Sequence, residues 1–188
     1  MDISVRPITI HDGELFATFM DQVDFLHQPD WKGCYCRFYH TLHDEVAWKK
    51  QRGAINRKEA IHEISEGLMH GYLAFLGDQP IGWLNASHWE NYPRTAEILK
   101  PHADLDSALM ICFLIDQRYR RQGVAKTLLT YAESDLKSLG YKKLFAIPSS
   151  TREITMDSYR GPIKMFEDHG FTPVESGFGH SLMLKSLI

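Results

Sequence analysis

A short basic segment with one glycine has the residue types of an anion-binding loop. It reads Arg120-Arg121-Gln122-Gly123-Val124-Ala125-Lys126. It offers no Ser, Thr, Asp or Asn to cap a following helix, so the first backbone N–H groups of that helix lack a local acceptor. Free N–H groups, a favourable helix dipole and basic side chains attract a phosphate, and a glycine lets the phosphate approach the backbone. The segment therefore predicts a site for a phosphate-bearing ligand.

A strand before the segment and a helix after it would hold this site in place. Residues 108–115 form an apolar run that reads as a buried strand. After the segment, apolar residues follow at steps of three or four and predict one buried helix face: Val124, Leu128, Ala132, Leu136 and Leu139. Gly140 would end the helix. An ordinary strand-to-helix turn with solvated arginines would fit the same residues, so geometry alone leaves both interpretations open.

The remaining elements follow from the same patterns. A strand over 3–8 precedes a helix capped at Thr9 or Asp12, and Asn56 resembles the cap of a second helix. Residues 72–84 read as a hairpin, and 88–106 as a polar connection. A strand over 143–147, a short helix opened by Gly161-Pro162 and closing strands over 171–174 and 181–184 complete the chain.

The residue types of the basic segment and their spacing resemble a known family signature. Arg120-x-x-Gly123-x-Ala125 matches the Arg/Gln-x-x-Gly-x-Gly/Ala motif of the GNAT superfamily of acetyl-CoA-dependent N-acetyltransferases. Residues 3–8 resemble the usual opening of that family, and 166–171 resemble its ending. The likeness covers nearly the whole chain. It implies an α+β GNAT fold in a single domain over 1–188, with a central, mostly antiparallel twisted sheet of about six to seven strands and about four helices.

The resemblance also implies an activity and a co-substrate. The chain would move an acetyl group from acetyl-CoA to a primary amine of a small molecule, by direct transfer in a ternary complex. The backbones of Phe113, Leu114 and Ile115 would pair with the pantetheine arm. The pyrophosphate would lie against six residues: Arg121, Gln122, Gly123, Val124, Ala125 and Lys126. A protein N-terminal or lysine acetyltransferase and a non-catalytic acetyl-CoA sensor are the alternatives.

The acid and the base depart from the family pattern. Many members place a Tyr where this chain has Phe166, so Tyr159 is the nearest residue that could protonate the leaving thiolate. Solvent could also do so. The strands over 108–115 and 143–147 contain no carboxylate. A base would therefore come from a flanking loop, and the candidates are His88, Glu90 and Glu97.

A segment rich in aromatic residues and cysteine, 31–43, is the second unusual feature. Its Cys34, Cys36, His40 and His43 are competent zinc ligands, but their spacing fits no standard zinc motif. We interpret the segment as the wall of the acceptor site, with no metal. The predicted substrate-binding residues are Trp31, Cys34, Tyr35, Cys36, Trp83 and Asn85. Such a wall suits a modest, partly apolar amine.

Composition sets the remaining expectations. The 188 residues carry a net charge of −3 with an isoelectric point near 6.3, which gives no basic footprint for nucleic acid. No apolar run approaches the roughly 20 residues of a membrane-spanning helix, and the first residues do not resemble a signal peptide. Three cysteines make no disulfide framework. We therefore expect a cytoplasmic monomer or homodimer that binds acetyl-CoA and a small amine, without nucleic acid or membrane.

Overall fold

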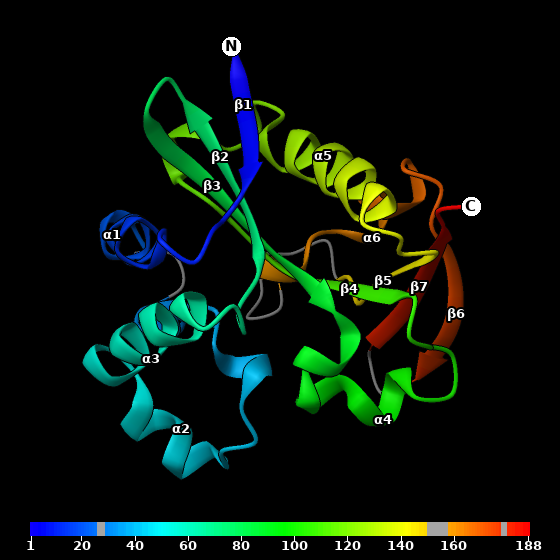
Figure 1. The fold of residues 1–188 in the computed structure, drawn as a ribbon, viewed down its shortest axis with the longest axis horizontal. Helices are drawn as coiled ribbons and strands as arrows, with labels where there is room; N and C mark the ends of the chain where they lie inside the picture. The colour runs from blue at the N-terminus through cyan, green and yellow to red at the C-terminus, as the bar shows by residue number, and fades with distance from the viewer. Residues whose placement is uncertain (26–28, 150–157, 178–179) are drawn as a thin grey trace.

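The computed structural model describes residues 1–25, 29–149, 158–177 and 180–188. These residues form one mixed sheet with helices on both sides (Figure 1). The strands are β1 (Ile3–Pro7), β2 (Gly71–Leu76), β3 (Gln79–His88), β4 (Ser107–Ile115), β5 (Lys143–Ala146), β6 (Thr172–Gly177) and β7 (His180–Ser186). The α-helices are α1 (Gly13–Gln22), α2 (Glu45–Gln51), α3 (Ala54–Ser65), α4 (Ala96–Leu99), α5 (Val124–Ser138) and α6 (Ile163–Glu167).

The sheet has the strand order β1-β2-β3-β4-β5-β7-β6. Its neighbours pair antiparallel except β4 and β5, which are parallel because α5 carries the chain back between them. The expected α+β architecture, with a mostly antiparallel sheet of six to seven strands, is confirmed. The hairpin over 72–84 is confirmed as β2 and β3.

Side chains alternate between two apolar layers across the sheet. On β2, Tyr72 and Ala74 pack toward α5 and α6, whereas Leu73 and Phe75 pack toward α1 and α3. Figure 1 shows α5 on one side of the sheet and α1 with α3 on the other. Because successive strand residues point to opposite faces, a strand buried on both faces is apolar throughout. This explains the continuous apolar runs of the central strands.

Two short helices lie outside the sequence prediction. Helix α4 lies in the segment over 88–106, which the sequence pattern predicts only as a polar connection. Trp89, Tyr92 and Leu99 from this segment pack beneath β4 and β5. Helix α2 has no buried residue and therefore no apolar stripe to detect. The Asp44 carboxylate caps α2, accepting a hydrogen bond from the Ala47 N–H at 2.8 Å.

Two local predictions were wrong. Helix α3 begins after Gly53, so Asn56 lies inside the helix rather than at its cap, and its side chain is fully buried. Leu139 is 67% exposed because α5 ends at Ser138, one residue before it. The helix stop itself is confirmed: Gly140 has φ +94°, a left-handed conformation that suits glycine.

A bulge in β4 changes which way its last residues point. Asn85 pairs with Cys112 and Ala86 pairs with Met110, so Ile111 is one extra residue on β4. Ile111 and Cys112 consequently face the same side of the sheet, and Phe113 turns toward α5. The bulge therefore sets the orientation of every β4 residue near the predicted site.

None of the helices in the described part of the chain has both the length and the apolar character that a membrane-spanning helix needs.

Candidate active site

The basic segment lies where it was expected, between the end of β4 at Ile115 and the start of α5 at Val124. Gly123 is the N-cap residue with φ +88°, and in the described structure no side chain caps the helix. A Cβ at Gly123 would meet no atom within 4 Å. Within the part of the chain that the structure describes, the start of α5 thus has no side-chain cap and has open space beside its N-cap residue, which is the arrangement that favours an anion.

Internal hydrogen bonds fix the loop before this helix. The Asp116 N–H donates to the Ile81 carbonyl at 3.0 Å, and the Arg118 guanidinium donates to both Asp116 carboxylate oxygens. This pairing lowers the pKa of Asp116. The Arg120 Nε donates to the Ile115 carbonyl at 3.2 Å. Arg121 and Lys126 remain exposed beside the helix start, where they can meet a ligand.

A cavity of about 260 Å³, here called the β4-edge cavity, begins at this helix start. Strands β4 and β5 pair only from Ser107 with Lys143 to Met110 with Ala146. Beyond that point the edge of β4 opens into the cavity. The cavity is lined by Asp24, Phe25, Trp31, Phe113, Leu114, Ile115, Arg120, Ala125, Ser158, Tyr159, Gly161, Pro162 and Met165.

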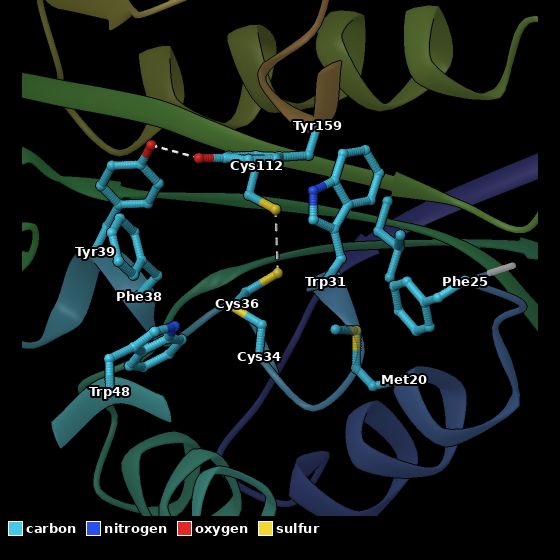
Figure 2. A pocket seen from close by; sticks show the side chains of 11 residues that line it. Met20, Phe25, Trp31, Cys34, Cys36, Phe38, Tyr39, Trp48, Cys112 and Tyr159 are labelled. Atoms are coloured by element: carbon cyan, nitrogen blue, oxygen red, sulfur yellow. Dashed lines mark hydrogen bonds between the residues drawn. The ribbon is translucent and has the colours of Figure 1, made fainter. Parts of the chain in front are cut away.

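A second cavity, of about 270 Å³, adjoins the first and is here called the aromatic cavity (Figure 2). It is lined by Met20, Phe25, Trp31, Cys34, Cys36, Phe38, Tyr39, Trp48, Cys112, Leu114 and Tyr159. None of these described lining side chains is charged. The wall is aromatic, aliphatic and sulfur-bearing, which suits an apolar ligand body.

Tyr159 lies at the junction of the two cavities. The junction residues, common to both walls, are Phe25, Trp31, Leu114 and Tyr159. The hydroxyl oxygens of Tyr159 and Tyr39 are 2.6 Å apart, and the Trp31 ring contacts the Tyr159 ring edge-on at 5.5 Å between centroids (Figure 2). Burial, and then the Tyr39 hydroxyl, raise the pKa of Tyr159 far above its usual range. Tyr159 thus keeps its proton at neutral pH and can donate a hydrogen bond into the junction.

The loop before η2 (Phe38–His40) reaches the aromatic cavity through an unusual backbone. Tyr35 has φ +47° and Cys36 has φ +52°, two consecutive left-handed residues that are not glycine. Such conformations persist only where the surroundings hold them. Here the Arg37 guanidinium donates to the Glu63 carboxylate at 2.6 Å and to the Asn56 amide oxygen at 2.9 Å. These buried contacts attach the loop to α3.

A buried polar network supports the same wall from β3. The Asn85 amide donates to the His40 Nε2 at 3.0 Å and to the Cys36 carbonyl at 3.3 Å, and the Tyr92 hydroxyl donates to the Asn85 oxygen at 2.8 Å. Burial lowers the pKa of His40 to about 4. His40 is therefore neutral at pH 7, with its Nε2 as an acceptor.

The structure brings part of the predicted site together. Of the nine predicted cofactor residues, Phe113, Leu114, Ile115 and Ala125 line the β4-edge cavity. Val124 is buried in the core, where only its backbone can face a ligand. The remaining four surround the exposed start of α5: Arg121, Gln122, Gly123 and Lys126.

The predicted acceptor residues fall into two groups, those that line the aromatic cavity and those that lie behind its wall. Trp31, Cys34 and Cys36 line the aromatic cavity, whereas Tyr35, Trp83 and Asn85 line neither cavity. Tyr35 donates a short hydrogen bond to the Asp21 carboxylate. The Trp83 ring, with no exposed surface, packs 4.7 Å from the Phe16 ring. With Asn85, these residues form a supporting layer behind the wall.

The three base candidates do not line either cavity. His88 lines a separate cavity with His70, and Glu90 is exposed beside it. Glu97 lines an open groove that also contains Tyr39 and Tyr159. Among the described residues, the carboxylate that lines the β4-edge cavity is Asp24, which accepts a hydrogen bond from Gln117 at 2.6 Å.

Several lining residues carried no usable sequence signal. Trp48 comes from α2, which the sequence pattern does not reveal. The helical spacing of α1 predicts that Met20 is buried but does not indicate that it borders a cavity. Arg120 was part of the motif but not of the predicted binding set. The described residues contain no group of three or more His, Cys, Asp or Glu side chains placed to hold a metal ion.

Comparison with known proteins identifies the family and the fold of this chain. The family model described as "Acetyltransferase (GNAT) family" matches residues 28–171. No match is found among curated protein sequences. A PaiA N-acetyltransferase from Thermoplasma acidophilum, solved with coenzyme A, superposes with a TM-score of 0.60 at 17% identity, covering 99% of each chain. The GNAT domain of PAT from S. lividans gives 0.61 at 21% identity, covering 97% of this chain and 89% of that one.

A third solved structure extends the range of acceptors seen with this fold. The ribosomal-protein-S18-alanine N-acetyltransferase from Escherichia coli superposes with a TM-score of 0.51 at 12% identity, covering 99% of this chain and 94% of that one. At these identities the likeness concerns the fold. The family match spans most of the sequence, and this chain belongs to the GNAT family of acetyltransferases. It is an acyltransferase of a family that uses acetyl-CoA.

Proposed function

We propose that this protein transfers the acetyl group of acetyl-CoA to the primary amine of a small, largely apolar acceptor. The cofactor would occupy the β4-edge cavity, with its pyrophosphate at the start of α5. The acceptor would occupy the aromatic cavity. The observation that carries the proposal is the junction of the two cavities, where Trp31, Leu114 and Tyr159 border both. Two ligands that enter from opposite sides would meet there, and such positioning supplies much of the rate.

The open edge of β4 fits the pantetheine arm. That arm is peptide-like. Phe113, Leu114 and Ile115 pair with β3 on one side but not with β5 on the other, and on this second side their backbone would bind the arm as a further strand. A backbone N–H near Cys112 would polarise the thioester carbonyl. The neutral amine nitrogen would attack the carbonyl carbon, and the carbon–sulfur bond would then break. The proton released from the nitrogen would reach the thiolate through solvent, so that the products are an amide and a thiol. The Tyr159 hydroxyl would donate its hydrogen bond to the departing thiolate.

The test is a thiol-release assay with acetyl-CoA and a panel of amines. We expect turnover with arylalkylamines, such as phenethylamine, in preference to polyamines, because the described wall of the aromatic cavity carries no charge. Trp48→Ala should raise the KM of the amine about tenfold and leave the KM of acetyl-CoA within about twofold. Arg120→Ala is the matched control on the other cavity. It should raise the KM of acetyl-CoA about tenfold and leave the KM of the amine within about twofold. No turnover with any amine would contradict the proposal.

An open groove supports a second acceptor class. The groove holds about 540 Å³, continues from Tyr39 and Tyr159 past Arg94 and Glu97, and could hold residues beyond an acetylated one. Protein or peptide amines are therefore the alternative acceptors. Peptides with a free N-terminal amine belong in the same assay, and faster turnover of peptides than of arylalkylamines would favour that alternative.

A further inference from the structure

Two cysteines from distant parts of the chain meet in the wall of the aromatic cavity. The Cys36 and Cys112 sulfur atoms are 3.2 Å apart, although the residues are 76 positions apart in sequence (Figure 2). Both are free thiols. A disulfide bond is about 2.05 Å long, so closing this pair requires the sulfur atoms to approach by only about 1 Å. Rotation of two short side chains can supply such a movement.

Separate features of the fold create this contact. The bulge at Ile111 turns Cys112 to the face that holds the aromatic cavity. The left-handed backbone at Cys36 turns the other thiol inward from the loop. Asn85 connects the two, because it pairs with Cys112 across the strands and donates to the Cys36 carbonyl. A bulge, a strained backbone and a buried amide thus converge on one pair of sulfur atoms.

We propose that Cys36 and Cys112 form a dithiol modification site whose ligand class is a small disulfide that enters through the aromatic cavity. Cys112 is partly exposed and Cys36 is buried, so Cys112 attacks first. Its sulfur bonds to one sulfur of the small disulfide, and the other sulfur leaves as a thiol with the proton. Cys36 then attacks the Cys112 sulfur and expels the second small thiol. The two cysteines are oxidised to one disulfide, and the small disulfide is reduced to two thiols.

The cross-link would act on the acceptor side of the site. It would tie the loop before η2 to β4 across the aromatic cavity, while the open start of α5 lies outside it. Acceptor binding should therefore weaken, and acetyl-CoA binding should persist. This consequence rests on the proposed function, whereas formation of the cross-link does not.

The experiment equilibrates the whole protein in buffers of reduced and oxidised glutathione. Samples start from the reduced protein and from diamide-treated protein, and are followed until both agree. Free thiols are alkylated, and digested peptides are mapped by mass spectrometry. We expect a peptide pair joined through Cys36 and Cys112, with Cys34 alkylated. The cross-linked protein should melt at least about 5 °C higher than the reduced protein, because a loop of 76 positions is closed.

Matched variants keep the result specific. Cys36→Ser and Cys112→Ser should each abolish the cross-link, and Cys34→Ser should retain it. A Cys34–Cys36 link, a lasting glutathione adduct on Cys112, or full alkylation from both starting states would overturn the proposal. In a second arm, cross-linking should raise the KM of phenethylamine at least about fivefold and leave the calorimetric Kd of acetyl-CoA within about twofold. An unchanged KM would overturn the effect on the acceptor, and no turnover by the reduced protein would count against the proposed function alone.

Discussion

The two cavities differ in what holds their walls in place. The β4-edge cavity rests on an apolar layer in which Phe113, Val124 and Leu128 pack between β4 and α5. The aromatic cavity also touches an apolar layer, but its loop is attached to the protein by buried polar contacts from Arg37 and Asn85. One wall is fixed by a repeating pattern of apolar side chains, and the other by individual hydrogen bonds.

This difference separates a binding site that many sequences can form from one that depends on particular side chains. A helix start and an open strand edge bind a phosphate and a peptide-like arm mainly through backbone groups, which many sequences can supply. The shape of the aromatic cavity depends on side chains such as Trp31 and Trp48. We therefore expect substitutions on one wall to leave the ligand of the other wall unaffected, except at the junction.

The largest effect should come from the junction itself. Tyr159→Phe should lower kcat about 100-fold, because the leaving thiolate loses its hydrogen-bond donor, and the Kd of acetyl-CoA should change little. Since burial raises the pKa of Tyr159, its proton should remain in place, and kcat of the wild type should not fall on the alkaline side up to about pH 10. Steady-state kinetics across pH and calorimetry measure both expectations.

Tyr39→Phe is the control for that result. It removes the hydrogen-bond partner of Tyr159 but leaves the hydroxyl of Tyr159 at the junction. We expect a loss in kcat below about tenfold. Equal losses in the two variants would mean that the hydrogen-bonded pair, rather than Tyr159 alone, stabilises the leaving thiolate.

The next largest effect should be confined to the β4-edge cavity. Gly123→Asp should raise the Kd of acetyl-CoA about 30-fold, because it places a carboxylate and a strained left-handed residue at the open helix start. Gly140→Asp is a matched control, since Gly140 has φ +94° and open space at the other end of α5. Calorimetry on both folded variants decides the matter. If the two variants bound acetyl-CoA with similar affinity, the pyrophosphate would not bind at this loop.

Sequence patterns predicted the elements whose apolar side chains recur at a regular spacing. The apolar run of β4, the helical spacing from Val124 to Leu136 and the uncapped Gly123 are local properties, and each matches the structure. The family resemblance implies a mostly antiparallel sheet of about six to seven strands, and the observed sheet confirms it.

The acceptor side could be predicted only in part, because its geometry depends on contacts between distant residues. Asn56 has the residue type of a helix cap, yet it is buried against Arg37. Asn85 was expected in the acceptor wall, yet its side chain holds His40 behind that wall. Nothing in the spacing indicates the bulge at Ile111, which brings Cys112 into the cavity. These features arise from tertiary packing, which single-sequence periodicity does not encode.

Acid should weaken the buried hydrogen-bond network behind the aromatic cavity and leave the apolar layer beneath the β4-edge cavity unaffected. Burial lowers the pKa of His40 from 6.5 to about 4, so the unfolded chain binds more protons than the folded protein between these values. The contribution of neutral His40 is present above pH 6.5 and is lost as the pH falls toward 4. We expect the free energy of unfolding to drop by up to about 1.4 kcal/mol per pH unit in this window from this group.

Denaturant titrations at several pH values measure that slope. His40→Gln should remove most of it, whereas His62→Gln, on the exposed surface of α3, should leave it unchanged. A slope that persists in the His40 variant would assign acid sensitivity to other groups.

The smallest effect should come from the thiols that line the aromatic cavity. Burial raises the pKa of Cys34 to about 12, so this side chain is a neutral thiol that packs as a small apolar group. Replacing both Cys34 and Cys36 by Ser puts hydroxyl groups against an apolar ligand, which should raise the KM of the amine about threefold. The Kd of acetyl-CoA should stay within about twofold. Met165→Leu, a conservative change on the β4-edge cavity, serves as the comparison and should leave the KM of the amine unaffected. If the double Ser variant instead weakened acetyl-CoA binding, the two walls would not be independent, and the cysteines would belong to the cofactor side of the junction.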